Sequence, residues 1–197
     1  MLDMFTSMLL GVGLGAVAII PPGPVTMSLI QVGVQRRART GAGAGAAVAA
    51  ADATLALVAL GVIALGAATR PGIAGATAAL GIVTMLVTGL FLAVRPAAVE
   101  QVVGTIERPV LTLFGITLIA PTTLLGWIAL LGAVPVSSTA DRVAIALGVM
   151  AFSAIWHPLL GLTAGRIGER ASARAIRRTT RAGGVALCAL ALGFAVL

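Results

Sequence analysis

Long apolar runs with almost no charge restrict the fold of this chain more than any other feature. They cover roughly residues 5–33, 42–67, 73–94, 109–134, 142–164 and 182–197. A helix that crosses a membrane needs about 20 mainly apolar residues. Soluble domains carry about 25% charged residues, whereas this chain has 10% and is 59% hydrophobic. The sequence therefore predicts an all-α membrane protein with about six transmembrane helices.

The last and the first apolar runs need separate consideration. The last run has about 16 residues, which would cover about 24 Å of a roughly 30 Å hydrocarbon core. Five spans followed by a dipping terminal segment are therefore an alternative. No positive charge precedes the first run, whereas a cleavable signal peptide begins with one, so we expect the first run to stay in the protein.

All thirteen basic residues are arginines that lie between or beside the apolar runs. Eleven of them follow the first, third and fifth runs, within 36–39, 95–108 and 166–181, and the other two are Arg70 and Arg142. Arginine is retained on the cytoplasmic side of membrane proteins. Loops one, three and five are therefore expected in the cytoplasm, with both termini outside if six helices cross. The same distribution explains the net charge of +7 without a nucleic-acid partner.

The arginines of the fifth loop recur every three or four residues, which places them on one side of a helix. They are Arg166, Arg170, Arg174, Arg177, Arg178 and Arg181. Such a face is either a solvated topology anchor or an interfacial helix that binds anionic lipid headgroups. In the second interpretation, membrane lipids are partners of this segment.

The two halves of the chain share a short motif, with Gly15 before Pro21 and Gly115 before Pro121 at the same spacing. Each half then contains three runs, and an odd number means that the second half enters the membrane from the opposite side. We expect a single transporter domain built as two inverted three-helix repeats. Within residues 1–197, the expected limits are a first repeat at about 5–94, a cytoplasmic loop at 95–108 and a second repeat at about 109–197.

The first motif is expected to break its helix. Pro21, Pro22 and Pro24 have no backbone N–H to donate, and Gly23 permits a turn that other residues resist. A helix that restarts near Pro24 leaves the N–H groups of its first turn, including that of Thr26, free to bind a carboxylate. The break is thus a predicted binding site for an anionic group.

The second motif predicts a break in the fourth helix, although a lone proline can also kink a helix without breaking it. Pro121 removes the partner of the Thr117 carbonyl, and Thr122 and Thr123 can place hydroxyls at the same point. Irregular backbone within a membrane persists where it is buried in protein or lines a watery cavity. The residues assigned to a substrate-binding or translocation site are therefore Pro21, Pro22, Gly23, Pro24, Thr26, Asp52, Pro121 and Thr122.

Asp52 belongs to that site because it lies among alanines near the middle of the second run. An ionised aspartate at that depth costs about 2.5 to 3.5 kcal/mol. It must face a polar cavity, pair with a cation or be held protonated, and each option favours a role in transport or proton coupling. His157, the lone histidine, lies in the fifth run, where it is either a second proton carrier or a structural residue.

The remaining features exclude other classes of protein or leave them open. One histidine and one cysteine, Cys188, do not suggest a metal site or a disulfide. The runs contain no nucleophile with a base, so no enzymatic activity and no cofactor are predicted. The spacings Gly11 to Gly15, Gly41 to Gly45 and Gly161 to Gly165 allow close helix packing. Whether the protein forms a homo-oligomer stays open.

The first half resembles the opening of the lysine-exporter (LysE/RhtB-type) transporters, most clearly over residues 10–66. The features that carry this resemblance are the Gly15–Pro24 motif, Gly33, the basic turn 36–39, Gly41, Gly45, Asp52 and Gly61. In the second half, similar features are Phe114, Gly115 and Pro121, followed by Arg181, Gly183 and Gly184. The chain departs from the family in two places. An asparagine commonly precedes the second proline in the family, whereas this chain has Ala120 there. It also has Val25 and Thr26 where a polar residue often follows the first motif.

The resemblance implies secondary active export of amino acids or similar small zwitterionic solutes, driven by the proton gradient, across a bacterial-type cytoplasmic membrane. By position it assigns residues 21–24, Asp52 and Pro121 to the translocation site. The alternatives are a non-transporting membrane assembly, a lipid-export accessory protein and a metal-cation exporter. The scarcity of histidine, cysteine and carboxylates argues against the last of these.

Overall fold

The computed structural model describes residues 3–20, 24–69, 71–94, 107–134, 138–167 and 173–196, which are almost entirely helical. The helices are α1 (Met4–Ile19), α2 (Pro24–Gln35), α3 (Ala38–Thr69), α4 (Pro71–Val94), α5 (Pro109–Ile119), α6 (Pro121–Ala133), α7 (Thr139–Ile167) and α8 (Ala173–Val196). The described residues form no strand, so the prediction of an all-α protein is confirmed.

The helix limits differ from the apolar runs in two ways. The first and fourth runs each contain two helices, α1 with α2 and α5 with α6. In addition, α8 begins at Ala173, well before the run at 182–197, because the arginine-rich segment is itself helical. Most of the predicted loop at 95–108 lies outside the described residues, as do Arg70 and residues 21–23.

Two helices are individually long and apolar enough to cross a membrane, namely α3 over Ala38–Gly66 and α7 over Thr139–Arg166. The pair α5 and α6, bent by 55° between its two parts, is a third candidate if it is taken as one span. The described residues thus contain two or three candidate spans by length and composition. The number of six spans stays a prediction.

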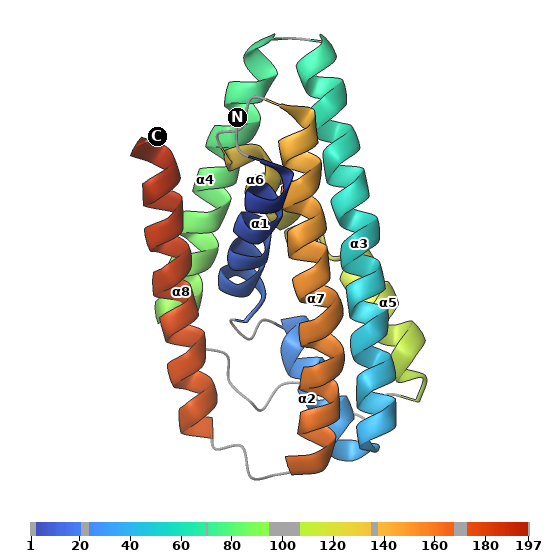
Figure 1. Ribbon diagram of the computed structural model, residues 1–197. Coiled ribbons are helices and arrows are strands. Elements are labelled where there is room, and N and C mark those ends of the chain that lie inside the picture. Colours follow the sequence, from blue (N-terminus) through green and yellow to red (C-terminus); the bar gives the residue numbers. More distant parts are fainter. Residues whose placement is uncertain are drawn as a thin grey trace.

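Most of the helices run up or down the bundle in alternating directions (Figure 1), although α5 is bent by 55° from α6. The path through α1 and α2 descends in that view, α3 ascends and α4 descends. The path through α5 and α6 ascends instead, α7 descends and α8 ascends. The directions of the helices in the second half are therefore the reverse of those in the first half.

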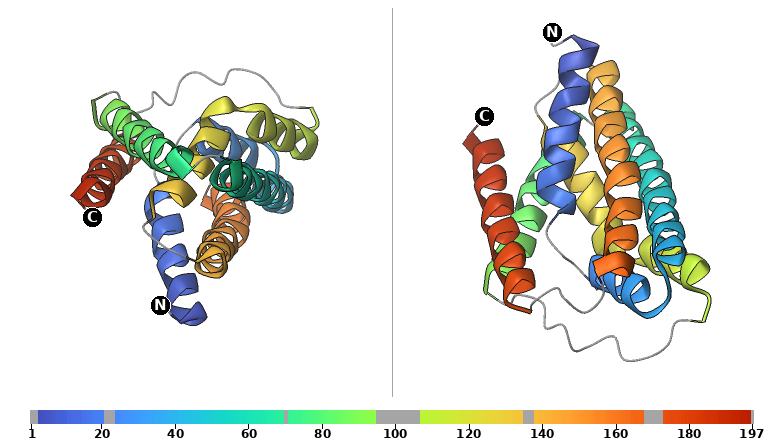
Figure 2. Two further views of the ribbon diagram at one scale, coloured as in Figure 1. Left: turned by 90° about the horizontal axis from the view of Figure 1, so that it is seen from above. Right: turned by 60° about the horizontal axis from the view of Figure 1, so that its bottom comes forward.

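The central contact of the bundle joins α3 to α7, while α4 and α8 lie together on one side (Figure 2). Glycines permit the close approach of α7 to its neighbours. A Cβ added to Gly41 or Gly45 would overlap the backbone of α7 at Gly161 or His157. A Cβ added to Gly11, on α1, would likewise overlap the carbonyl of Ile145. The packing role predicted for these glycines is confirmed.

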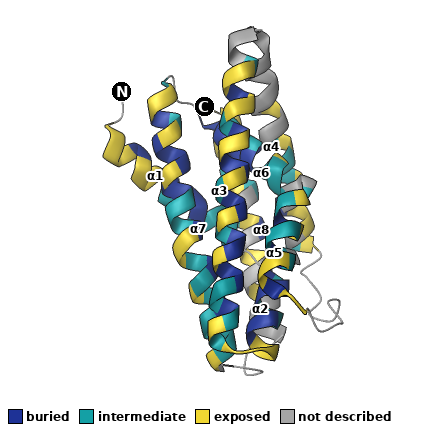
Figure 3. Ribbon diagram, turned by 90° about the vertical axis from the view of Figure 1, so that its right-hand side faces the viewer, coloured by how far each residue is buried: buried dark blue, intermediate teal, exposed yellow. Residues whose placement is uncertain are grey.

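Two apolar clusters fill the bundle at different heights. Along α3, buried and exposed residues alternate as the helix turns its faces inward and outward (Figure 3). The upper cluster, named for its place in Figure 1, includes Leu14, Leu55, Ile63, Trp127, Leu131, Ile145 and Val149. The lower cluster consists of Leu29, Val32, Ala44, Val48 and Leu113, with Val25 and Leu160 packed against it.

Most of the described arginines collect at the lower end of the bundle in Figure 1, where α2 ends and α3, α5 and α8 begin. Those with exposed side chains there are Arg36, Arg37, Arg39, Arg108, Arg166, Arg178 and Arg181. Arg142 lies at the opposite end, in the first turn of α7. Among the described residues, the arginines thus lie mostly at one end of the bundle.

Candidate translocation site

A polar group of side chains lies between the two apolar clusters. On α3, Asp52 lies one turn after Val48 of the lower cluster and just before Leu55 of the upper cluster. On α7, Ser153 and His157 lie between Val149 and Leu160 in the same way. The exposed fraction is 6% for Asp52, 0% for Ser153 and 4% for His157. These three residues form a buried polar centre within apolar helices.

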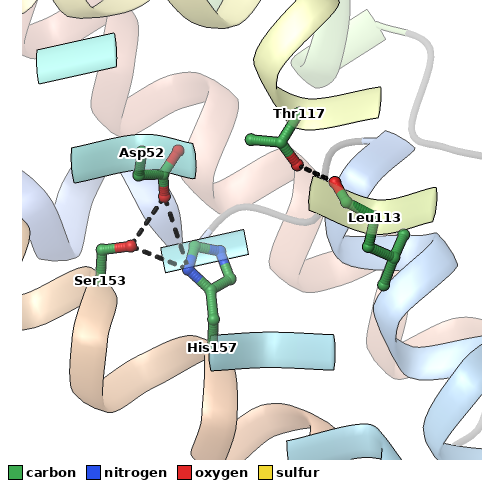
Figure 4. Close-up of polar contacts among 5 residues, drawn as sticks. All are labelled: Asp52, Leu113, Thr117, Ser153 and His157. Carbon is green, nitrogen blue, oxygen red and sulfur yellow. Dashed lines mark hydrogen bonds and ion pairs between the residues drawn. The ribbon is translucent and has the colours of Figure 1, made fainter. Parts of the chain in front are cut away.

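Hydrogen bonds connect the polar centre across the contact between α3 and α7 (Figure 4). The hydroxyl of Ser153 donates to Oδ2 of Asp52 at 2.7 Å and lies 3.0 Å from Nδ1 of His157. The direct distance between Nδ1 of His157 and Oδ2 of Asp52 is 3.6 Å, which is too long for a good hydrogen bond. Ser153 is therefore the side chain that joins the other two.

Trp127 brings α6 into the same centre. Its side chain forms a hydrogen-bonding interaction with the Asp52 carboxyl group, and its exposed fraction is 6%. Because buried charge is tolerated when it is paired and hydrogen-bonded, Trp127 and Ser153 together compensate the carboxylate from two helices. The backbone of α3 cannot do so, since its groups are already used within the helix.

The second proline motif coincides with a helix boundary. Ala120 has φ −70° and ψ 111°, the extended conformation that the residue before a proline favours. Pro121 then occupies the first position of α6, where the missing N–H has no consequence. Close to this boundary, the hydroxyl of Thr117 donates to the Leu113 carbonyl at 2.8 Å, as Figure 4 shows.

The first proline motif lies at the junction of α1 and α2. The N–H of Ile20 still donates to the Ala16 carbonyl, whereas Pro21, Pro22 and Gly23 lie outside the described residues. Pro24 is the first residue of α2, so the first-turn N–H groups have no partner within that helix. Thr26 is buried in this turn, with an exposed fraction of 7%.

Trp156 is a buried donor on the stretch of α7 between its contacts with α1 and α2. Gly15 of α1 lies against Phe152, and Gly33 of α2 lies against Gly161. Trp156 lies between these two points and stacks on Phe152, with ring centroids 5.9 Å apart. Its Nε1 atom is buried and has no hydrogen-bond partner within the part of the chain that is described. Among the described residues, the indole N–H of Trp156 is thus a buried donor without a partner, on the part of α7 between its contacts with Gly15 and Gly33.

A second buried carboxylate, Asp141, lies in the first turn of α7. It accepts a hydrogen bond from Ser7 of α1 at 3.1 Å and one from Ser138 at 2.6 Å. The N–H of Asp141 donates back to the Ser138 hydroxyl at 3.0 Å. In this reciprocal arrangement, Ser138 closes the start of α7 in the manner of a helix cap.

The structure brings together two of the predicted site residues, Asp52 and His157. Of the other predicted residues, Thr26 lies on α2, and Pro121 and Thr122 lie on α6. The hydrogen bonds that connect Asp52 and His157 do not include them. Sequence reasoning missed Ser153, although its position four residues before His157 places both on one helix face. It also missed Asp141, for which the spacing from Ser138 is a capping signal.

Apolar helices around a buried polar centre define a helical membrane protein of the kind that includes transporters. The family model for the LysE type translocator matches residues 16–197, so the chain belongs to this family. It is therefore a membrane exporter of small solutes, and its family is one of transporters rather than enzymes. The resemblance recognised in the sequence is confirmed. No curated protein and no solved structure matches the chain.

Proposed function

We propose that this translocator exports amino acids or similar small zwitterionic solutes through the cytoplasmic membrane by proton-coupled secondary active transport. The observation that carries the proposal is the buried carboxylate of Asp52, held at the centre of the bundle by Ser153 and Trp127. A titratable group at this depth is costly and typical of substrate or proton pathways. The arginine-rich lower end is then the cytoplasmic face.

Six spans in two inverted repeats are the architecture that we propose for this function. The opposite course of the two halves in Figure 1 supports it. The contacts support it as well, since α1 and α2 both pack on α7, while α5 and α6 both pack on α3. Exchanging the halves thus exchanges these contacts, as an inverted repeat requires. The repeats are residues 5–94 and 109–197, within one domain.

The two apolar clusters suggest how access alternates. In a transporter the central site must open to one side at a time, through movement of one repeat against the other. The upper cluster lies between the polar centre and the outer end, and the lower cluster lies between it and the cytoplasmic end. We infer that the clusters act as the outer and inner gates, separating in turn.

A zwitterionic solute needs one site for its carboxylate and one for its ammonium group. The first-turn N–H groups of α2 have no partner within that helix and lie at the positive end of its dipole, and the indole of Trp156 on α7 is a further buried donor. These groups would bind the carboxylate, with Pro21, Pro22 and Gly23 setting the break. Asp52 would bind the ammonium group, and a proton would replace that group when the solute leaves.

Proteoliposomes test this proposal directly. Efflux of a panel of radiolabelled neutral, basic and acidic amino acids is measured with and without an imposed pH gradient. We expect accelerated efflux of at least one zwitterionic member when the gradient is present, and none in empty liposomes. Absence of flux for the whole panel from correctly inserted protein would refute an amino-acid substrate. Flux that ignores the gradient would refute proton coupling.

A further inference from the structure

The hydroxyl of Ser153 reaches both titratable side chains of the polar centre. Its Oγ lies 2.7 Å from Oδ2 of Asp52 and 3.0 Å from Nδ1 of His157, while those two atoms are 3.6 Å apart. A hydroxyl both donates and accepts. It can therefore complete a continuous hydrogen-bonded path that the carboxyl group and the imidazole cannot form directly.

We propose that Ser153 is the relay through which Asp52 and His157 exchange the transported proton. In one state, protonated Asp52 donates to the Ser153 hydroxyl, which donates to the free Nδ1 of His157. In the other, imidazolium Nδ1–H donates to Ser153, which donates to the Asp52 carboxylate. The two states interconvert when one proton moves from Asp52 to Oγ and another moves from Oγ to Nδ1. Serine itself is unchanged.

This relay rests on the proposed transport function and assigns a route to its proton. When a solute ammonium group reaches Asp52 from the cytoplasm, it favours the carboxylate form, so the proton moves through Ser153 to His157 and is released from there to the cytoplasm. When the solute leaves to the outside, Asp52 takes up a new proton from that side. Export would then be coupled to proton movement by competition at Asp52, with His157 as the temporary proton acceptor.

No other titratable side chain on the packed helices competes for the proton among the described residues. The helices α1, α2, α4, α5 and α6 carry none. On α3 the other charged residue is Arg39, near the start of the helix. On α7 the others are Asp141, Arg142 and Arg166, in its first and last turns. The Asp52–Ser153–His157 group is thus separated from them along both helices.

The backbone holds the relay in register. Ser153 and His157 are one helical turn apart on α7. Gly45 of α3 lies against the backbone of His157, and a Cβ on Gly45 would overlap the His157 carbonyl group. The absence of a side chain on Gly45 therefore lets α7 approach α3 beside Asp52. Because Ser153 has an exposed fraction of 0%, water has no direct access to replace its hydroxyl.

A spectroscopic experiment tests the relay independently of transport. Full-length protein in lipid nanodiscs is labelled with ¹⁵N-histidine, and the Nδ1 signal of His157 is recorded before and after Asp52→Asn. We expect this substitution to shift the signal in otherwise wild-type protein. In a Ser153→Ala background we expect a shift at least about threefold smaller, because the hydrogen-bonded connection is lost. An equal shift in both backgrounds would overturn the relay.

Flux measurements provide the second test. Ser153→Ala should lower gradient-driven export by about 100-fold, a typical loss for a positioned proton-transfer group, while solute exchange at equal pH stays within about twofold. Ser153→Thr, which keeps the hydroxyl, should restore export. Ser7→Ala is the matched control, because Ser7 is equally buried and also donates to a carboxylate. Parallel loss of exchange and export would overturn the relay in favour of a structural role.

The two tests separate the relay from the function on which it rests. If wild-type protein moves no solute, the proposed function fails, and the Nδ1 signal still decides whether Ser153 connects the two side chains. If wild-type protein exports solute but Ser153→Ala does so equally well, the relay fails and the proposed function stands.

Discussion

Asp52 and Asp141 are two buried carboxylates with similar surroundings and different compensation. Their exposed fractions are 6% and 7%. Each accepts a hydrogen bond from a serine on another helix, Ser153 at 2.7 Å and Ser7 at 3.1 Å. Asp141, however, lies in the first turn of its helix, whereas Asp52 lies well inside α3. The position within the helix separates the two.

At the start of α7, local structure stabilises the negative charge. The positive end of the helix dipole favours a carboxylate there, and Ser138 both donates to Asp141 and accepts from it. Inside α3 the helix dipole and a capping residue do not stabilise the charge of Asp52. Its hydrogen-bonding partners are instead Trp127 of α6 and Ser153 of α7. Asp141 therefore has partners at the start of its own helix, whereas the partners of Asp52 come from α6 and α7. Under the proposed function, Asp52 is the carboxylate that gains and loses a proton.

Removing the charge from each aspartate gives the largest expected difference. Asp52→Asn should reduce gradient-driven solute export by roughly 100-fold, because the amide neither releases a proton nor pairs with an ammonium group. Asp141→Asn should leave export per folded molecule within about twofold. Both are measured in proteoliposomes at matched protein density. Equal export by Asp52→Asn and wild type would remove Asp52 from the mechanism.

Adding one methyl group on either side of α7 sharpens the comparison. Gly45→Ala and Gly11→Ala both introduce a Cβ that overlaps the backbone of α7, at His157 and at Ile145 respectively. Each should lower stability by about 1–3 kcal/mol. Displacement beside His157 should also reduce export by about tenfold, which Gly11→Ala should not do.

The matched control for these two variants is Gly13→Ala, because a Cβ at Gly13 meets nothing within 4 Å. It should be neutral in unfolding and in export. If Gly11→Ala impaired export per folded molecule as much as Gly45→Ala, the distinction between the polar centre and the contact of α1 with α7 would be wrong.

Removing the Asp141 side chain should destabilise the folded protein more than removing an exposed carboxylate. Asp141→Ala removes the bonds to Ser7 and Ser138 and should destabilise the fold by about 1–2 kcal/mol. Thermal unfolding in detergent measures this effect. Ser7→Ala combined with Asp141→Ala should then add little further loss, since the two residues share one hydrogen bond. A fully additive loss would show that Ser7 stabilises α1 in another way.

The helices could be predicted from the sequence because apolar runs and prolines are local signals. For example, α5 ends at Ile119 and α6 begins at Pro121 because a proline disfavours the helical conformation at the residue before it, Ala120. The apolar run by itself begins only at 182, whereas α8 begins at Ala173. The three- and four-residue spacing of the arginines was the signal that this preceding segment is helical. Spans and their orientation stay predictions, since length and composition identify two or three candidates in the described ranges.

The polar centre could be predicted only in part. Asp52 and His157 are unusual within apolar runs, so each was identified as a functional candidate by itself. Their connection depends on the antiparallel packing of α3 on α7, which brings Asp52 next to Ser153, 101 residues further along the chain. No local pattern encodes such a contact. Serine is also common in membrane helices, so Ser153 gave no signal alone.

Asp3 offers the smallest expected effect, as a third carboxylate that is exposed. It caps α1, where its Oδ1 atom accepts a hydrogen bond from the Thr6 N–H at 2.7 Å, and this bond lowers the pKa of Asp3 below its ordinary value. Since the folded-state pKa is the lower one, the capping bond should stabilise the protein above the ordinary carboxyl range. That stabilisation is lost as the pH falls through the lowered pKa.

We therefore expect Asp3→Ala to lower the unfolding temperature slightly at about pH 6, and by less as the pH falls below the ordinary carboxyl range and the Asp3 carboxylate becomes protonated. The effect should be much smaller than that of Asp141→Ala and should shrink in high salt, because an exposed charge is screened by solvent and ions. Thermal unfolding in detergent at one pH above and one pH below the ordinary carboxyl range measures it, and Asp3→Asn, which keeps a capping oxygen, is the control. A difference between wild type and Asp3→Ala that is the same at both pH values would show that the charge of Asp3 contributes nothing. The capping oxygen of Asp3 would then stabilise the start of α1 equally well in its neutral form.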